Sequence, residues 1–267
     1  MSKVVLITGG SSGIGKSMGE YLHHKGFIVY GTSRNPDRIL NSVFPLVSLD
    51  VRDTDSIDAA VAKVIALAGR LDVVINNAGI GITGPLEEIP MQEIKNNFET
   101  NFFGPIAVMQ AVLPQMRAQQ SGLIINITSI AGYMGLPYRS IYSASKGALE
   151  LITESLRMEV KSFGIAITNV APGDFATNIA AGRFHAPVLQ GSAYEHTYGP
   201  SLKTMDAHVD NGANPDEMAA AVYSIIKNPN PKIHYKVGAF MQKISIVLKR
   251  VLPDKVYEKM LMNHYKL

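Results

Sequence analysis

The stretch Thr8-Gly9-Gly10-Ser11-Ser12-Gly13-Ile14-Gly15 follows directly after the apolar run Val4–Ile7, and it decides the fold class. Glycine permits positive φ angles and a close approach of the backbone, so the amide groups of such a turn can surround a diphosphate at the start of the next helix. The spacing Gly-x-x-x-Gly-x-Gly differs from the common Gly-x-Gly-x-x-Gly pattern of dinucleotide sites. A glycine-rich turn that binds nothing is the alternative. The context of strand, turn and helix favours a nucleotide site.

Short apolar runs alternate with longer helical segments on both sides of this turn. Strands are predicted at Val4–Ile7, Phe27–Tyr30, Leu46–Leu49, Val73–Ile75, Leu123–Ile127, Ile165–Val170 and Ile233–Val237. Helices are predicted at Ile14–Lys25, Thr54–Leu67, Gln92–Gln120, Tyr142–Phe163, Pro215–Lys227, Phe240–Leu252 and Asp254–His264. Most of the strands are nearly continuous in Val, Ile and Leu, as in parallel strands that are covered on both faces. We therefore predict one α/β domain over residues 1–267, a Rossmann-like, doubly wound parallel sheet in three layers.

Composition excludes several function classes. The chain of 267 residues is 46% hydrophobic and 18% charged, enough apolar material for a sizeable core. It has no cysteine, which excludes disulfides and thiolate metal sites, and no histidine spacing predicts a metal. We expect a cytoplasmic protein, because no leader peptide and no membrane span of about 18 apolar residues is found. The net charge of +3 combines +5 in residues 236–267 with −2 elsewhere, so no basic core surface predicts nucleic-acid binding.

The end of the second predicted strand indicates which cofactor is used. An NAD site usually has a carboxylate there for the ribose 2′-hydroxyl, but this chain has Arg34 and no carboxylate before Asp37. A guanidinium can hold a 2′-phosphate through parallel hydrogen bonds. NADP(H) is therefore predicted, with NAD(H) as the weaker alternative. An Arg34 that only faces water is the competing interpretation.

A tyrosine and a lysine at helical spacing are the candidates for catalysis. Tyr142 and Lys146 lie four residues apart, on one face of a predicted helix. A nearby cation favours the phenolate and brings the pKa of tyrosine towards the range in which it can exchange protons. The same spacing at Tyr21/Lys25 and at Tyr223/Lys227 shows that the pattern alone is weak. Only Tyr142 follows a strand that ends in a small hydroxyl residue, Ser129.

Together these motifs resemble those of the short-chain dehydrogenases/reductases, over about residues 3–240. The matching pieces, all in the order of the family, are Thr8–Gly15, Asp50-Val51, Asn76-Asn77-Ala78-Gly79, Asn101, Ser129, Tyr142/Lys146 and Pro172-Gly173. The resemblance implies an oxidoreductase that interconverts a carbonyl and an alcohol by hydride transfer. It also implies association through the two long helices, as a homodimer or homotetramer.

The resemblance assigns roles to individual residues. Tyr142 would be the general acid/base, Ser129 would hydrogen-bond the reacting oxygen, and Lys146 would lower the pKa of the tyrosine and hold the ribose. Asn101 would position a water for proton relay, or else brace a kink in its helix. The cofactor-binding residues would be Gly9, Ser11, Ser12, Gly13, Ile14, Gly15, Arg34, Asp50, Val51, Asn77, Gly79, Tyr142, Lys146, Pro172, Gly173, Phe175 and Thr177. Many NADP-preferring relatives carry a basic residue where this chain has Ser12, so Arg34 supports NADP(H) almost alone.

The segment 174–213 has no clean period and is expected to be a loop that acts as a substrate lid. Its apolar residues, with those that follow Ser129, predict a small hydrophobic substrate that is steroid-, retinoid- or lipid-like. These residues are Phe175, Phe184, His185, Val188, Leu189, Tyr194, His196 and Tyr198, with Met134, Leu136, Pro137 and Tyr138. Packing within the lid is the alternative role for several of them.

The helical extension at 240–267 is basic and amphipathic. It can touch a membrane surface, although packing on its own domain or on a partner subunit is the commoner role. The extension loosely resembles the retinol and 17β-hydroxysteroid dehydrogenase branch of the family. Two other functions stay open, a nucleotide-sugar epimerase or dehydratase and a non-catalytic NADP(H)-binding sensor. The first needs a longer C-terminal domain, and the second would not need the Ser129, Tyr142 and Lys146 set.

Overall fold

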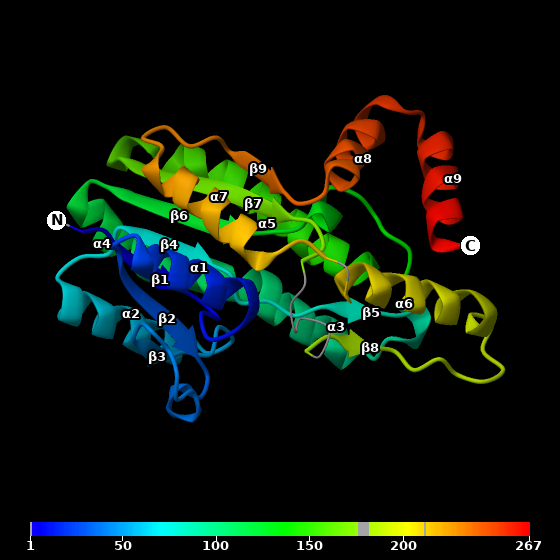
Figure 1. Cartoon of the computed structure of the whole chain (residues 1–267), viewed down its shortest axis with the longest axis horizontal. Helices are drawn as coiled ribbons and strands as arrows, with labels where there is room; N and C mark the ends of the chain where they lie inside the picture. The colour runs from blue at the N-terminus through cyan, green and yellow to red at the C-terminus, as the bar shows by residue number, and fades with distance from the viewer. Residues whose placement is uncertain (1, 176–181, 211) are drawn as a thin grey trace.

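In the residues that the computed structural model describes (2–175, 182–210 and 212–267), seven parallel strands form a twisted sheet in the order β3-β2-β1-β4-β6-β7-β9 (Figure 1). The strands are β1 Val4–Ile7, β2 Ile28–Ser33, β3 Leu46–Ser48, β4 Val73–Asn76, β6 Gly122–Ile127, β7 Ile165–Pro172 and β9 His234–Val237. Every neighbouring pair is parallel. The predicted Rossmann-like sheet is thus confirmed, and the order of connection reverses between β1 and β4.

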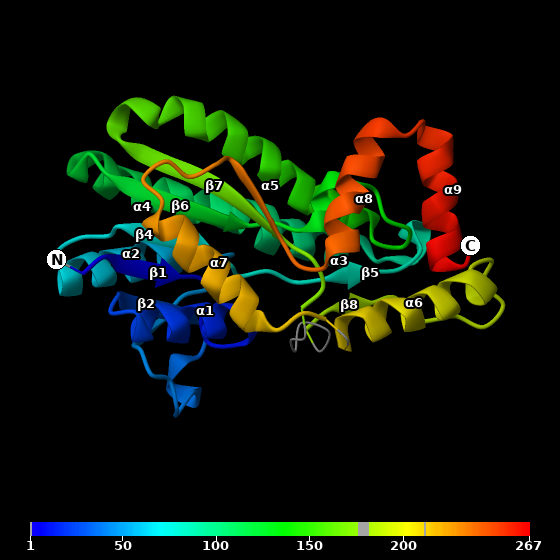
Figure 2. The same ribbon diagram turned by 45° about the horizontal axis from the view of Figure 1, so that its top comes forward.

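Helices cover both faces of the sheet. Helices α1 (Gly13–His24) and α7 (Pro215–Lys227) lie on one face, and α2 (Thr54–Ala68), α4 (Gly104–Gln119) and α5 (Ser140–Glu159) lie on the other (Figure 2). Short 3-10 turns lie at Pro36–Arg38, Leu86–Glu88, Ile130–Tyr133 and Lys161–Phe163. The single parallel sheet therefore has an apolar core on each side, which explains why its strands are apolar throughout.

Strand β1 shows how the sequence produces these two cores. Val4 and Leu6 pack against α2, α4 and α5, whereas Val5 and Ile7 pack against α1 and α7. Successive side chains of a strand point to opposite faces, so a continuous apolar run is needed when both faces are covered. All four side chains are almost fully buried. Each contributes about 1.5–3 kcal/mol by leaving water.

The predicted helix over Gln92–Gln120 is interrupted. Helix α3 (Met91–Phe98) continues into a π-helical segment, Glu99–Phe103, before α4 begins at Gly104. Two contacts account for the break. The Asn101 side chain bonds the backbone of Ile80, and a Cβ atom at Gly104 would lie 2.9 Å from the carbonyl oxygen of Val51. A regular helix would have to move both residues.

The predicted loop over 174–213 contains more regular structure than its sequence indicated. Strand β8 (Phe184–His185) pairs with β5 (Ile82–Thr83), and helix α6 spans Glu195–Asp210. The buried residues Tyr198, Ser201 and Met205 lie at helical spacing and face inward. Gly199 and Pro200, which are poor helix formers, obscured this period in the sequence. Thr177 lies outside the described residues.

The C-terminal extension forms a helical hairpin, α8 (Phe240–Val251) and α9 (Asp254–Tyr265). It packs on its own domain, one of the roles that the sequence left open. Ile246 and Tyr257 are buried in a small cluster with Ile130 and Met134. Among the described residues, no helix combines the length and the apolar character that crossing a bilayer requires.

Candidate active site

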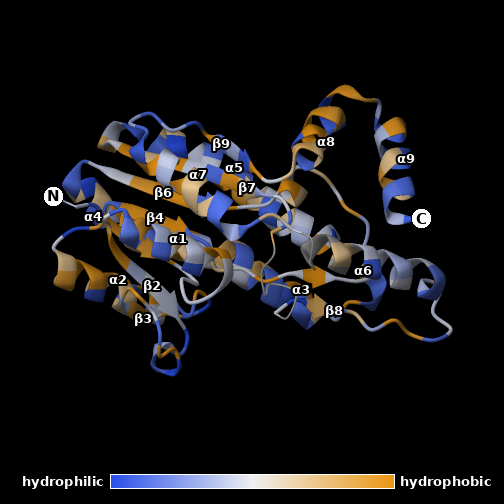
Figure 3. Ribbon diagram, viewed as in Figure 1, coloured by the Kyte–Doolittle hydropathy of each residue, from blue (hydrophilic) through white to orange (hydrophobic). Residues whose placement is uncertain are grey.

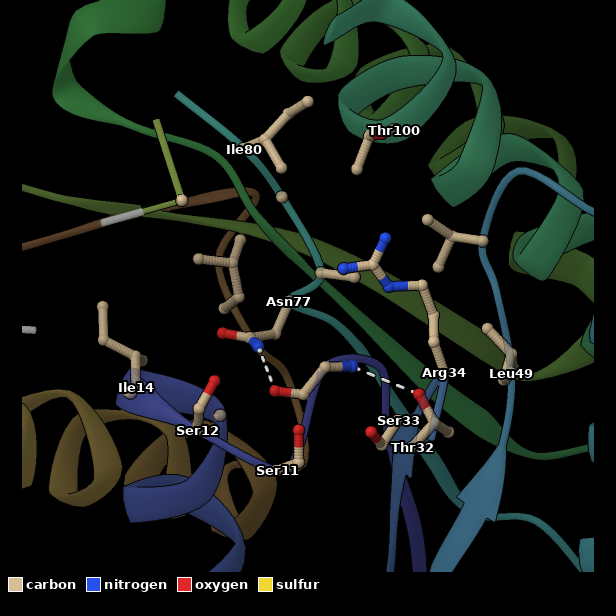
Figure 4. Close-up of a pocket in the computed structure, with 18 of the residues that line it drawn as sticks. Ser11, Ser12, Ile14, Thr32, Ser33, Arg34, Leu49, Asn77, Ile80 and Thr100 are labelled. Atoms are coloured by element: carbon tan, nitrogen blue, oxygen red, sulfur yellow. Dashed lines mark hydrogen bonds between the residues drawn. The ribbon is translucent and has the colours of Figure 1, made fainter. Parts of the chain in front are cut away.

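A cavity of about 510 Å³ lies at the carboxyl ends of the strands, beside the point where the strand order reverses. It is lined by the glycine turn after β1, the ends of β2, β3 and β4, and part of α5 (Figure 4). Most of the residues predicted to bind a cofactor line this cavity. They are Gly9, Ser11, Ser12, Gly13, Ile14, Gly15, Arg34, Asp50, Val51, Asn77, Gly79, Tyr142, Lys146 and Pro172.

The glycine turn presents backbone amides to this cavity. Gly9 and Gly13 have positive φ angles, of 63° and 52°, which glycine adopts without strain. A Cβ atom at Gly15 would overlap the carbonyl oxygen of Gly9 and lie 2.5 Å from Asn77 Nδ2. Helix α1 begins here without a side-chain cap from Ser12 and without an acidic residue in its first turn. Its leading N–H groups are therefore suited to an anion.

Three side chains hold the turn in shape. Asn77 Nδ2 donates to the carbonyl oxygens of Thr8 and Gly9, at 2.9 and 3.2 Å. The Thr8 hydroxyl accepts the backbone N–H of Asn77, at 2.9 Å, and that of Ala78, at 3.0 Å. The Gly9 N–H donates to the Thr32 hydroxyl at 3.2 Å. Sequence reasoning placed Asn77 on the cavity but missed the bracing role of the two threonines.

Cationic residues gather at the end of the cavity near β2 and β3. The Arg34 side chain extends from the end of β2 into the cavity, on the side of Leu49 and away from Ser12 (Figure 4). Arg52, which the sequence did not single out, also lines this end and donates its backbone N–H to Asp50 Oδ1 at 3.0 Å. Burial alone would raise the pKa of Asp50, but Arg52 and Arg34 together lower it. Asp50 is thus a carboxylate that bonds Arg52 and also feels the charge of Arg34.

Tyr142 and Lys146 line the cavity from α5. Lys146 Nζ lies 6.0 Å from the centre of the Tyr142 ring and donates to the carbonyl oxygen of Ile127 at 2.9 Å. The lysine side chain is buried, and this desolvation lowers its pKa, while the charges of Tyr142 and Glu150 act in the opposite direction.

Ser129 and Asn101 do not line the cavity themselves, although their chain neighbours Thr128 and Thr100 do. Ser129 follows β6, and its hydroxyl accepts the N–H of Ala131 at 3.1 Å. Asn101 is fully buried in the π-helical segment. Its Oδ1 accepts the N–H of Ile80 and its Nδ2 donates to the carbonyl oxygen of Ile80, both at 2.8 Å. The asparagine therefore braces a kinked helix against the cavity wall, one of the two roles considered for it.

A buried carboxylate behind Lys146 was missed by sequence reasoning. Glu150, one turn further along α5, is 5% exposed and accepts hydrogen bonds from four side chains. They are Tyr133 at 2.9 Å, Asn169 at 2.9 Å, His234 at 2.8 Å, and the hydroxyl of Thr128. The cluster joins α5 to the ends of β6, β7 and β9. Its signal in the sequence is only a glutamate on the apolar face of a helix.

Two residues predicted at the nicotinamide end, Gly173 and Phe175, are not among the residues that line the cavity. Phe175 is 3% exposed and packs in the core beneath α7, because a bridge to Ala213 draws this segment under the helix. Gly173 does not line the cavity, and a Cβ atom there would overlap the Gln242 side chain of α8. Pro172, the last residue of β7, lines the cavity and was predicted, whereas Gly182 lines it and was not predicted.

The residues predicted to surround the substrate divide into two groups. Phe184, Tyr194 and Tyr198 pack in one apolar cluster with Tyr138 and Tyr142. The rings of Tyr138 and Tyr198 lie 5.1 Å apart, and the Tyr198 hydroxyl donates to the carbonyl oxygen of Ala186 at 3.0 Å. Aromatic packing therefore holds Phe184, Tyr194 and Tyr198 in the same cluster as Tyr142. Met134 and Leu136, by contrast, pack against the C-terminal hairpin.

Comparison with known proteins identifies relatives over the whole chain. The family model described as short chain dehydrogenase matches residues 3–187. A protein named 3-ketodihydrosphingosine reductase, from Bacteroides thetaiotaomicron, is 42% identical over 96% of this chain and 95% of its own length. The uncharacterized oxidoreductase YbbO of Escherichia coli is 36% identical over 98% of this chain and 94% of its own length.

Solved structures show the same fold. A short-chain dehydrogenase from Streptomyces avermitilis superimposes with a TM-score of 0.86 and 32% identity, and the match covers 100% of this chain and 97% of that one. The structure described as ElxO with NADP bound has a TM-score of 0.73 and 28% identity, with 89% and 97% coverage. The Rossmann-like architecture and the family motifs are therefore found together.

Proposed function

Because this chain belongs to the short-chain dehydrogenase family and is an oxidoreductase, we propose that it uses NADP(H) to interconvert a carbonyl and an alcohol on a hydrophobic, lipid-like substrate. The observation that carries the proposal is that Tyr142 and Lys146 line the same cavity as the glycine turn and Arg34. One cavity thus offers an anion-binding turn, a cation for a phosphate and a phenol for proton transfer.

The residues of the cavity near α1 and β2 fit the diphosphate and the 2′-phosphate of NADP(H). The uncapped start of α1 and the turn at Gly9 and Gly13 offer N–H groups to a diphosphate. Arg34 offers a fork of donors to a 2′-phosphate, and Arg52 adds positive charge at the same end. When bound, the cofactor supplies the hydride that reduces a carbonyl carbon, or accepts the hydride from an alcohol.

Tyr142 moves the proton. In reduction its phenol gives a proton to the substrate oxygen as the carbonyl carbon gains the hydride, and in oxidation its phenolate takes the proton from the hydroxyl. The bond from Lys146 to Ile127 fixes the ammonium 6.0 Å from the centre of the Tyr142 ring, where it would also hold the ribose of the cofactor. Ser129, which follows β6, would hydrogen-bond the reacting oxygen. Asn101 keeps the kinked helix against the cavity wall and would position the water that returns a proton to Tyr142.

A lipid ketone is the substrate that we propose. The aromatic cluster of the lid, with Tyr138 and Tyr198 beside Tyr142, gives the reacting end an apolar surrounding. The relative from Bacteroides thetaiotaomicron is named for 3-ketodihydrosphingosine, a ketone on a long alkyl chain. That name and the apolar lid together support a long-chain keto lipid over the steroid and retinoid alternatives.

The two other functions have less support. The matching family model and relatives are described as a dehydrogenase, a reductase and an oxidoreductase, which favours the proposed function over a nucleotide-sugar epimerase or dehydratase. A sensor without catalysis would not require both Tyr142 and Lys146 on the cavity wall.

Binding of NADPH and NADH to the purified protein tests the choice of cofactor. We expect tighter binding of NADPH, and about 30-fold weaker NADPH binding in Arg34→Ala, because a charge-assisted bond to the phosphate contributes about 2 kcal/mol. NADH binding should barely change. Arg38→Ala, an exposed arginine that does not line the cavity, is the matched control. Equal affinities for the two cofactors in the unmutated protein would contradict the proposal.

Turnover of 3-ketodihydrosphingosine with NADPH tests the substrate and the acid/base. Tyr142→Phe should bind NADPH normally but lose roughly 10²–10⁴-fold in kcat, the usual contribution of a positioned acid/base. A ketone with a similar number of atoms but no long alkyl chain should be turned over more slowly than 3-ketodihydrosphingosine. Full activity of Tyr142→Phe would show that Tyr142 is not the acid/base. Equal turnover of ketones with and without the alkyl chain would contradict the proposed lipid substrate.

A further inference from the structure

We propose that the hairpin of α8 and α9 is a docking surface for an anionic membrane, and that the protein binds there from the aqueous side without spanning the bilayer. The occupant is a lipid surface that carries acidic headgroups. The proposal goes beyond the oxidoreductase activity, and it stands on the exposure, charge and attachment of this hairpin.

An apolar stripe runs along the outer side of the hairpin. On α8, Phe240, Val247 and Val251 follow one another at helical spacing and are 70%, 53% and 74% exposed. On α9, Val256 and Met260 lie one turn apart and are 48% and 44% exposed. Figure 3 shows apolar colour along α8 and at the bend into α9, at the end of the molecule remote from α2. We call Phe240, Val247, Val251, Val256 and Met260 the apolar stripe; exposed apolar side chains on a basic amphipathic helix can enter a bilayer interface.

Basic residues flank the stripe. Residues 236–267 hold seven Lys or Arg against two acidic residues, whereas the rest of the chain has a net charge of −2. Arg250, Lys255 and Lys259 are exposed beside the stripe, while Lys249 is paired with Asp254 at 2.9 Å. This pattern complements a negatively charged surface. A second copy of the same hairpin would instead bring two patches of charge +5 together, so self-association is disfavoured here.

The inner side of the hairpin is attached to the segments around the active site. The Tyr257 hydroxyl bonds Met134 Sδ at 2.7 Å, shortly after Ser129, and Gln242 Nε2 donates to Asp174 Oδ2 at 2.6 Å, shortly after β7. The Ser201 hydroxyl of the lid helix α6 donates to the carbonyl oxygen of Tyr265 at 2.8 Å. In Figure 1 the hairpin and α6 lie at the same end of the molecule. A docked hairpin would therefore hold the lid side of the cavity close to the membrane.

Sedimentation with lipid vesicles tests the proposal, with neither substrate nor cofactor present, so that its outcome does not depend on the proposed catalysis. Vesicles of phosphatidylcholine are compared with vesicles that contain 30% phosphatidylglycerol. We expect strong binding to the acidic vesicles at low salt and weak binding to the neutral ones. Equal partition to both, or binding to neither, would overturn the proposal.

Two matched pairs of variants assign the binding to the hairpin. Val251→Asp, in the last turn of α8, should weaken binding at least tenfold, whereas Leu67→Asp, an exposed apolar residue in the last turn of α2, should not. Lys255→Gln with Lys259→Gln should weaken binding about 25-fold, roughly fivefold for each lysine. Lys63→Gln with Lys161→Gln changes the net charge equally and should have little effect.

Two further measurements keep the result interpretable. The unfolding temperature of each variant shows whether it folds, since Val251 and Leu67 are both exposed and their substitution should leave it within a few degrees. Light scattering shows whether the protein self-associates. A dimer that is abolished by Val251→Asp and kept by Leu67→Asp would assign the stripe to a second copy and overturn the membrane proposal.

Discussion

Replacement of Glu150 should change both the stability of the protein and the pH range of its activity. The carboxylate is buried and accepts from Thr128, Tyr133, Asn169 and His234. Glu150→Ala would leave these donors without their acceptor, and two of them, Thr128 and Asn169, are buried. Breaking a buried charged cluster costs about 3–5 kcal/mol. For a domain of this size that corresponds to a fall of roughly 10 °C in the unfolding temperature.

The isosteric variant Glu150→Gln separates charge from shape. It fills the same space but removes the negative charge one turn from Lys146, whose pKa burial lowers and Glu150 raises. The pKa of Lys146 should therefore fall further, and the ammonium should be lost at a lower pH. Because kcat requires that ammonium, its alkaline limb should move to lower pH in Glu150→Gln. Glu150→Asp, which retains the charge, should keep the limb in place.

Glu154→Gln is the control, because Glu154 bonds the other ring nitrogen of His234 at 3.0 Å but is about half exposed. Its loss should cost less than about 1 kcal/mol. Thermal unfolding followed by circular dichroism and a pH series of kcat are the assays. If Glu150→Gln and Glu154→Gln have the same unfolding temperature and the same pH profile, the buried carboxylate does not support Lys146 and the reasoning fails.

Three further predictions follow from the geometry. Gly15→Ala should weaken NADPH binding at least tenfold in a titration, because its Cβ atom would overlap the carbonyl oxygen of Gly9 and displace the turn; an unchanged affinity would contradict the assigned turn. Burial and the nearby Glu150 raise the pKa of Tyr133 above its unfolded value of 10.0, so its contribution to stability is complete below pH 10 and is lost as the pH rises above it. In urea unfolding from pH 8 to 11, Tyr133→Phe should therefore lose less stability than the unmutated protein. Ile246→Ala should cost about 3 kcal/mol in chemical denaturation and expose the hairpin to limited proteolysis, because Ile246 is 1% exposed in the cluster that anchors it.

The sequence predicted the sheet well because each strand is buried on both faces. Runs such as Val4–Ile7 and Ile165–Val170 have no other stable use in a chain of this length, and their order with the helices between them specifies a parallel sheet. The glycine turn was equally accessible, since positive φ angles and close backbone contacts can be met by glycine alone at Gly9 and Gly15. These features depend on local chemistry.

Features that depend on distant contacts could not be predicted. The break in the helix near Asn101 requires the backbone of Ile80, which comes from another connection of the fold. The acceptor role of Glu150 requires Thr128 directly after β6, Asn169 in β7 and His234 in β9, which is 84 positions away. The spacing of residues along one helix reveals neither the Ile80 partner of Asn101 nor the donors to Glu150. Tertiary contacts therefore supply what the pattern lacks, and these contacts concentrate around the candidate site.

Gly173 illustrates how a motif residue can serve the fold and the site together. Its place directly after Pro172 suggests a contact with the cofactor, yet a side chain there would overlap Gln242 of α8. Gln242 in turn bonds Asp174 through both its amide nitrogen and its oxygen, at 2.6 and 3.3 Å. The glycine is thus required so that the hairpin can close against the end of β7. Pro172 lines the cavity, and the next residue, Gly173, is the one that Gln242 of the hairpin approaches. A shift of the hairpin on a membrane would therefore be transmitted to a position one residue from the cavity wall.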